Sequence, residues 1–214
     1  MITKIKKKRL IFFLPVFNRG GAPESIIKLS KFLISYDYSV LIISIGKNYY
    51  KKDLKKIGCD TIEITSKRTL YAIFKLRNLI QKEINKKYIQ TILISNIHYA
   101  NIISIISCIK LKKIKIILTE RSSISELHIF NNLLSYLKNK FIFFLDKYLY
   151  KFADLIITNS KFEKFITFEN LKIYKDGIIL LTGGIENGFI GKPASLGNTK
   201  LVNDRLKILK ELFY

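Results

Sequence analysis

The sequence predicts an α/β protein: a Rossmann-like parallel sheet with helices on both of its faces. Short apolar runs recur along the chain, which is typical of strands that are buried on both sides. Between them lie segments whose apolar residues recur at helical spacing. Strands that alternate with helices form βαβ units with right-handed crossovers, and this handedness excludes most sheet topologies. Of the topologies that it allows, we favour the Rossmann-like one.

The apolar runs predict seven strands, at residues 10–17, 40–45, 61–65, 91–95, 114–119, 154–158 and 177–181. The first run follows a basic start and also fits a signal peptide. Asn18, Arg19 and two glycines come after it instead of a typical cleavage site, so a core strand fits better. No stretch of about 18 or more residues is free of polar breaks, and we expect no transmembrane helix.

Helical spacing predicts helices at residues 24–36, 51–57, 70–87, 99–111, 127–152, 162–172 and 199–213. Gly58 directly follows the second of these helices, and we expect it at the C′ position, where glycine ends many helices. A glycine-rich segment at 182–191, followed by Pro193, indicates a loop before the last helix.

The composition is that of a globular protein with a strong basic excess. The 214 residues are 49% hydrophobic and 25% charged, enough for one full domain with residues left over. The net charge of +22 comes mostly from Lys in a chain that is also rich in Ile, Asn, Tyr and Phe. A/T-rich codons account for much of this pattern; the alternative is attraction to nucleic acid or anionic lipid. We expect no specific nucleic-acid partner, because the charge is dispersed and no Arg-rich reading helix stands out.

The cysteine and histidine residues give no sign of a disulfide or a metal site. Cys59 and Cys108 stand alone, without Cys-x-x-Cys spacing, and two buried, reduced thiols in the cytoplasm are the expected state. His98 and His128 form no metal-ligand spacing with them. We therefore expect a cytoplasmic protein with no metal and no cofactor.

The turn after the first strand is a candidate anion site. Ligands of open parallel sheets bind beyond the carboxyl ends of the strands. Gly20, Gly21 and Ala22 follow the first strand there and come just before the next predicted helix. Glycines let the backbone approach a ligand, and a helix N-terminus attracts phosphate. The glycines match neither the dinucleotide nor the P-loop motif, and an ordinary tight turn is the alternative.

Three more turns at the same predicted edge carry polar residues. His98 follows the fourth strand and suits acid–base or hydrogen-bonding chemistry, although a structural histidine is the commoner case. Glu120 and Arg121 follow the fifth strand, where Arg121 could present its guanidinium to a phosphate or the two could form a local pair. Ser160 follows the sixth strand and could simply cap the next helix.

Taken together, these turns resemble the N-terminal domain of family 4 (group 1) glycosyltransferases, which are retaining enzymes of the GT-B fold. The resemblance rests on the order and spacing of four segments along residues 10–193. The matching segments are Gly20-Gly21-Ala22 with Glu24, Glu120-Arg121-Ser122, Ala153-Asp154-Leu155-Ile156-Ile157-Thr158-Asn159-Ser160, and Gly184-Ile185-Glu186-Asn187-Gly188-Phe189 with Pro193.

The resemblance implies a division of the chain. Residues 1–182 would form a Rossmann-like acceptor-side domain. Residues 183–214 would form the interdomain linker and the start of a nucleotide-sugar-binding domain. That second domain uses a Lys/Arg pair and a Glu-x7-Glu motif in the family, and no two Glu residues of this sequence have that spacing. Many members carry His where Arg121 stands, so the family's catalytic His does not transfer to that position. Gly184 replaces the usual Asn of the linker.

The resemblance also implies an activity. It implies transfer of a sugar from a nucleotide-sugar donor to a polysaccharide or lipid-linked acceptor with retention, by an enzyme that is truncated or split. The donor phosphates would lie at Gly20, Gly21 and Ala22, with Ser160 and Gly184 contributing, and His98, Glu120 and Arg121 are the catalytic candidates. The alternative is a non-catalytic acceptor-binding or membrane-docking subunit, which completes its site with a second chain.

One predicted helix suggests a membrane contact. Its apolar residues recur on one face, with lysines interleaved, as in Leu137, Phe141, Phe144 and Tyr148. A helix that turns this face to the core is the interpretation we favour. The alternative is an interfacial helix on anionic lipid, which would place the protein peripherally on the inner face of the cell membrane and suit a lipid-linked acceptor.

Overall fold

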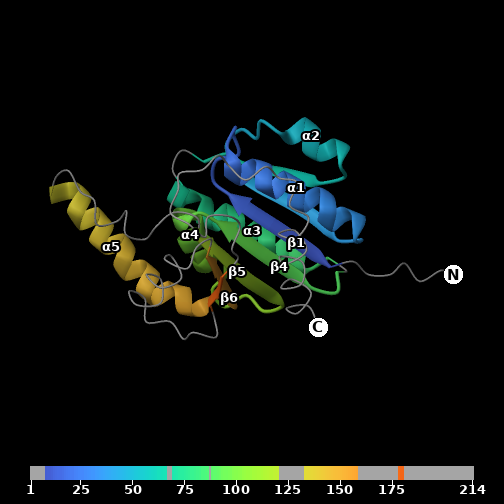
Figure 1. Ribbon diagram of the computed structural model, residues 1–214. Coiled ribbons are helices and arrows are strands. Elements are labelled where there is room, and N and C mark those ends of the chain that lie inside the picture. Colours follow the sequence, from blue (N-terminus) through green and yellow to red (C-terminus); the bar gives the residue numbers. More distant parts are fainter. Residues whose placement is uncertain (1–7, 67–68, 87, 121–132, 159–177, 181–214) are drawn as a thin grey trace.

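The computed structural model describes residues 8–66, 69–86, 88–120, 133–158 and 178–180. Its centre is one parallel β-sheet (Figure 1). The seven strands of this sheet lie in the order β3-β2-β1-β4-β5-β6-β7. The strands are β1 (Arg9–Leu14), β2 (Ser39–Ile45), β3 (Asp60–Ile64), β4 (Thr91–Asn96), β5 (Ile114–Glu120), β6 (Leu155–Thr158) and β7 (Ile178–Leu180). The predicted α/β, Rossmann-like class with a parallel sheet is confirmed.

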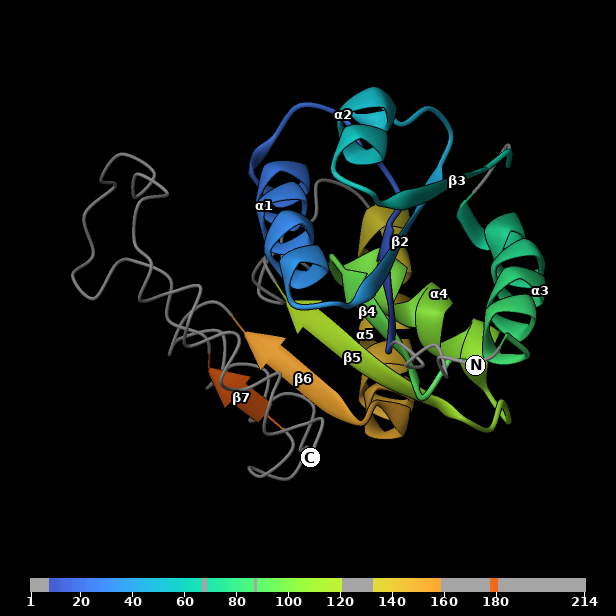
Figure 2. The ribbon, with the colours of Figure 1, turned by 90° about the vertical axis from the view of Figure 1, so that its right-hand side faces the viewer.

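Helices lie on both faces of this sheet, as predicted, and Figure 2 shows α1 and α3 on opposite sides of it. The helices are α1 (Gly21–Ser35), α2 (Lys51–Lys56), α3 (Ala72–Ile84), α4 (His98–Cys108) and α5 (Leu133–Leu149), with 3-10 turns η1 (Thr69–Tyr71) and η3 (Tyr150–Phe152). Helices α1 and α2 pack on one face, and α3, α4 and η3 pack on the other.

The alternation of side chains along the strands divides the interior into two cores. In β1, Ile11 and Phe13 point into the core beneath α3 and α4. Leu10 and Phe12 point into the core beneath α1 and α2. All four are fully buried, since successive side chains of a strand face opposite ways. This is why the central strands read as continuous apolar runs.

Element boundaries differ from the prediction where local chemistry intervenes. Strand β1 ends at Leu14 rather than at residue 17, because Pro15 follows and has no N–H to donate to the sheet. Helix α1 begins at Gly21, three residues earlier than predicted. Strand β5 extends to Glu120, so this residue is the end of a strand and not part of the turn. Gly58 follows α2 with φ 86°, which confirms the predicted C′ glycine.

Helix α5 ends three residues earlier than predicted and faces the other way. The predicted start of this helix, at residues 127–132, lies outside the described residues. The helix ends at Leu149 and continues as the 3-10 turn η3. The apolar stripe that we expected in the core is at the surface, so that expectation is wrong. The opposite face of α5 enters the interior and buries Ile142 and Asp146. The predicted helices at 162–172 and 199–213, and the predicted boundary between residues 182 and 183, lie outside the described residues.

Both thiols are buried and free, as expected. Burial raises the pKa of Cys59 to about 11 and that of Cys108 to about 12, so neither is a reactive thiolate at neutral pH. Among the residues that the structure describes, no helix is long and apolar enough to cross a bilayer. Nor does that part of the chain bring together three or more His, Cys, Asp or Glu side chains around a possible metal position.

Candidate functional site

The candidate site lies at the carboxyl edge of the sheet, between β1 and β4. The chain places β2 and β3 on one side of β1, and β4 to β7 on the other. The strand order therefore reverses between β1 and β4, and this is where open parallel sheets bind ligands. The glycine turn follows β1, and His98 follows β4 after a single residue. Two of the predicted turns thus flank the switch point, and Glu120 ends the next strand, β5.

The glycine turn at β1 leaves open space in front of a helix N-terminus. Gly20 is the N-cap residue of α1 and makes no side-chain capping bond. A methyl group added to Gly21 would meet nothing within 4 Å. The amide of Glu24 donates to the Gly20 carbonyl at 3.2 Å, which closes the first helical turn. Gly21 and Ala22 are left at the positively polarised end of the helix, where Gly21 is exposed and Ala22 is partly exposed.

The turn between β4 and α4 holds an unusual backbone conformation. Ile97 has φ 78°, a region that β-branched residues rarely occupy. Two hydrogen bonds hold it there: its amide donates to the Thr119 carbonyl at 3.3 Å, and its carbonyl accepts from the Asn101 amide at 3.0 Å. Strained backbone of this kind occurs at functional sites. Here it carries the chain from the sheet into α4, whose first residue, His98, is buried.

His98 lies between two buried carboxylates. Its Nε2 is 3.0 Å from Asp146 Oδ2 in α5, and its Nδ1 is 3.8 Å from Glu120 Oε1 in β5. Burial lowers the pKa of His98, but the two carboxylates outweigh burial and raise the pKa to about 9. The imidazole is therefore protonated at neutral pH. It joins the carboxyl end of β5 to helix α5.

Glu120 is held by neutral donors as well. The Tyr150 hydroxyl donates to Oε1, and Asn101 Nδ2 donates to the same oxygen at 2.7 Å. Burial, followed by the charges of Glu120 and Asp146, raises the pKa of Tyr150 well above its usual value, which keeps the hydroxyl protonated as a donor. Three elements, α4, η3 and β5, therefore meet at the Glu120 carboxylate.

Asp146 completes this cluster and is fully buried. Burial raises the pKa of Asp146 to about 6, while His98 opposes that rise. Its approach to His98 is an ion-pair contact rather than an aligned hydrogen bond. The Oδ1 atom of Asp146, Oε2 of Glu120 and Oδ1 of Asn101 accept no hydrogen bond from the described residues. We refer below to His98, Asn101, Glu120, Asp146 and Tyr150 as the His98 cluster.

Sequence reasoning singled out His98 and Glu120 but missed their partners. Asp146 is the only acidic residue of α5, and that isolated charge in an apolar and basic helix was the available signal. Asn101 and Tyr150 gave no such signal, because nothing in the sequence around them indicates that their side chains turn inward. The burial of the cluster favours positioning the end of β5 over direct contact with a substrate. The remaining predicted site residues, Arg121, Ser160 and Gly184, lie outside the described residues.

Known structures share this fold. A glycosyltransferase from Rickettsia africae aligns over 94% of this chain and 49% of its own, with 23% identity and a TM-score of 0.58. HepE of Anabaena in complex with UDP and glucose aligns over 82% of this chain and 44% of its own, with 16% identity and a TM-score of 0.57. UGT71G1 of Medicago truncatula, complexed with UDP-glucose, aligns over 96% of this chain and 57% of its own, with 12% identity and a TM-score of 0.53.

These similarities show the fold. It is a Rossmann-like α/β fold that matches GT-B glycosyltransferases. The chain spans about half the length of each of the three structures. The sequence matches no protein-family model and no curated protein. At these identities the shared fold does not by itself fix an activity.

Proposed function

We propose that this chain is part of a retaining glycosyltransferase that takes its sugar from a nucleotide-sugar donor. The observation that carries the proposal is the glycine turn at the switch point of a sheet whose structural neighbours include complexes with UDP and UDP-glucose. A leaving nucleoside diphosphate develops negative charge, and fixed N–H donors at a helix N-terminus stabilise it. Gly20, Gly21 and Ala22 supply that group of donors in our proposal.

We assign the acceptor to the class of polysaccharides or lipid-linked glycans, and the reaction to the cytoplasmic side of the cell membrane. The support is the family resemblance of the sequence turns together with the basic charge of the chain. In the family 4 glycosyltransferases that the sequence resembles, the second domain holds most of the nucleotide-sugar. A domain or chain of that kind is therefore the proposed partner that completes the donor site.

Calorimetric titration of the protein with UDP, UDP-glucose and a panel of other nucleotide-sugars tests the proposal. Gly21→Leu fills the open space in front of α1, whereas Gly21→Ala adds only a methyl group that meets nothing. We expect binding by the wild type and by Gly21→Ala, and at least a tenfold loss of affinity in Gly21→Leu. Circular dichroism confirms that both variants keep the fold.

Two results would contradict this assignment. Equal affinity of Gly21→Leu and wild type would place the nucleotide away from the glycine turn. No binding of any nucleotide-sugar would remove the donor role from this chain. The second candidate function, an acceptor-binding subunit that acts with a partner, would then be the better account.

A further inference from the structure

Helix α5 exposes a continuous apolar stripe. Six large side chains of α5, and Phe152 just after it, are between 48% and 78% exposed. The residues are Leu133, Leu134, Leu137, Phe141, Phe144, Tyr148 and Phe152. At about 100° per residue they occupy an arc of about 100° on the helix. Large contiguous apolar surfaces of this kind mark interaction sites on soluble proteins.

The packing of α5 fixes which way this stripe faces. Ile142 and Asp146 lie on the opposite side of the helix and are buried, and Asp146 contacts His98 of α4 through the 3.0 Å ion pair. Rotating the helix to bury the stripe would expose Ile142 and break that pair. The outward orientation is therefore held by the interior, and Figure 1 shows α5 extending past the body of the sheet.

Lysines flank the stripe on both sides. Lys138 lies along one flank, and Lys140 and Lys147 lie along the other; all three are exposed. Lys140 Nζ lies 4.6 Å from the centre of the Tyr136 ring, and Lys138 Nζ lies 5.7 Å from that of Tyr99 in α4. The one acidic residue of the helix, Asp146, is buried. The surface that α5 presents is thus apolar in the middle and only cationic at its edges.

We propose that this α5 stripe docks the protein on an anionic lipid bilayer. The apolar side chains enter the boundary between headgroups and acyl chains, and the flanking lysines contact anionic headgroups, as in interfacial amphipathic helices. A protein partner is less well matched, because the cationic edges would need acidic partners along both flanks at once. The net charge of +22 adds long-range attraction to the same surface.

This docking proposal names the residues that would hold the protein at the membrane, and it rests on the membrane location given in the proposed function. Docking does not require the sugar-transfer chemistry, since the stripe and the glycine turn are separate surfaces. Lipid binding and nucleotide binding are measured independently, so failure of one is distinguishable from failure of the other.

Liposome flotation of the full chain tests the docking surface. Vesicles of phosphatidylcholine alone are compared with vesicles that also contain phosphatidylglycerol. We expect the wild type to float with the anionic vesicles, to stay largely unbound with the neutral ones, and to be released partly by salt. Phe141→Ser combined with Phe144→Ser should reduce the bound fraction at least fivefold, because it removes two apolar side chains from the centre of the stripe. Both side chains are exposed, so these changes should leave the core intact.

Matched controls separate the stripe from general stickiness and charge. Tyr71→Ser with Phe74→Ser removes two aromatic residues of η1 and α3 that are at least as exposed as Phe141 and Phe144 and lie outside the α5 stripe. We expect this pair of changes to leave flotation unchanged.

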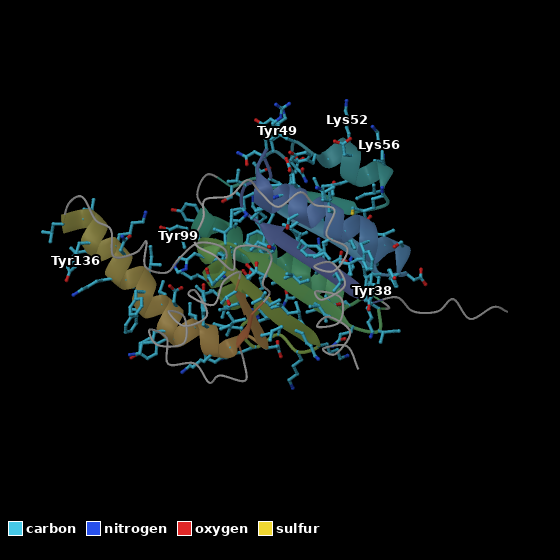
Figure 3. The ribbon with its side chains drawn as sticks, viewed as in Figure 1. Tyr38, Tyr49, Lys52, Lys56, Tyr99 and Tyr136 are labelled. Carbon is cyan, nitrogen blue, oxygen red and sulfur yellow. The ribbon has the colours of Figure 1, made fainter. Side chains whose placement is uncertain are left out.

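The charge control compares lysines on two helices. Lys140→Gln with Lys147→Gln removes two cations beside the stripe. Lys52→Gln with Lys56→Gln removes two from α2, which Figure 3 shows far from Tyr136 and the exposed length of α5. We expect only the α5 pair to reduce binding to the anionic vesicles.

Three outcomes would overturn the proposal. The first is wild-type protein that does not float with anionic vesicles. The second is α5 variants that float as well as the wild type, or matched control variants that lose as much flotation as the α5 variants do. The third is a concentration-dependent dimer that Phe141→Ser with Phe144→Ser dissociates in the absence of lipid binding, which would show that the stripe joins two copies of the chain.

Discussion

The ionisation of His98 links the chemistry of one residue to the stability of the fold. In the folded protein its pKa is about 9, against an ordinary value of 6.5. The folded state therefore holds a proton that the unfolded state has released between these two values. Stabilisation from His98 is fully present below pH 6.5 and is lost as the pH rises through 9. The raised pKa of Asp146 acts in the same direction at lower pH, between 3.8 and about 6.

We predict that the free energy of unfolding falls by about 3 kcal/mol between pH 6.5 and 9. Urea unfolding at a series of pH values measures it. His98→Gln keeps a polar side chain of similar size but cannot titrate, so its stability should be nearly constant over that interval. A wild-type curve that is flat there, or a variant curve that matches it, would show that His98 does not carry the proton.

Arg9 gives a second prediction at the residue scale. This guanidinium is buried at the amino end of β1, where Nε lies 2.9 Å from Glu83 Oε2 in α3. Replacing it with Met leaves the buried Glu83 carboxylate with Lys86 as its one remaining cation among the residues that the structure describes. We expect a loss of about 3 kcal/mol, because breaking a buried ion pair from one side leaves the other charge poorly compensated. The double variant with Glu83→Leu should recover much of that loss in the same unfolding assay; no recovery would contradict this reason.

At the scale of elements, the sequence predicts which segments form strands and helices but not the orientation of α5. The alternation of apolar runs identifies each described strand, because burial on both faces leaves a local signature. The orientation of α5 depends on Asp146 meeting His98, which is distant in sequence. An amphipathic pattern shows that a helix has an apolar side; only the packing of the opposite side shows where that apolar side faces.

The end of α2 offers a test of one element boundary. Gly58 has φ 86° and follows the helix at its C′ position. Gly58→Ala should lower the free energy of unfolding by about 1 kcal/mol, because a residue with a Cβ is strained there. Gly21→Ala is the matched control, since Gly21 is the first residue of α1 and has open space. Equal stabilities of the two variants would contradict the proposed cap.

At the scale of the whole molecule, the strand order explains why the candidate site could be predicted only in part. Residues that follow parallel strands gather at one edge, so Gly21, His98 and Glu120 were expected at the same edge. Which of them face solvent is decided by the helices above them. The turn at Gly21 is exposed, whereas His98 and Glu120 are covered by α4, α5 and η3. No local pattern distinguishes these two cases.

The central claim is that a nucleotide-sugar binds at the switch point between β1 and β4. Backbone amide NMR during titration with UDP-glucose tests it most directly, because it reports where the ligand lies. We predict the largest shift changes at Gly20, Gly21 and Ala22, with smaller ones at Ile97 across the switch point. Changes centred instead on the amino edge around Arg9, or spread evenly over the exposed lysines, would contradict the claim.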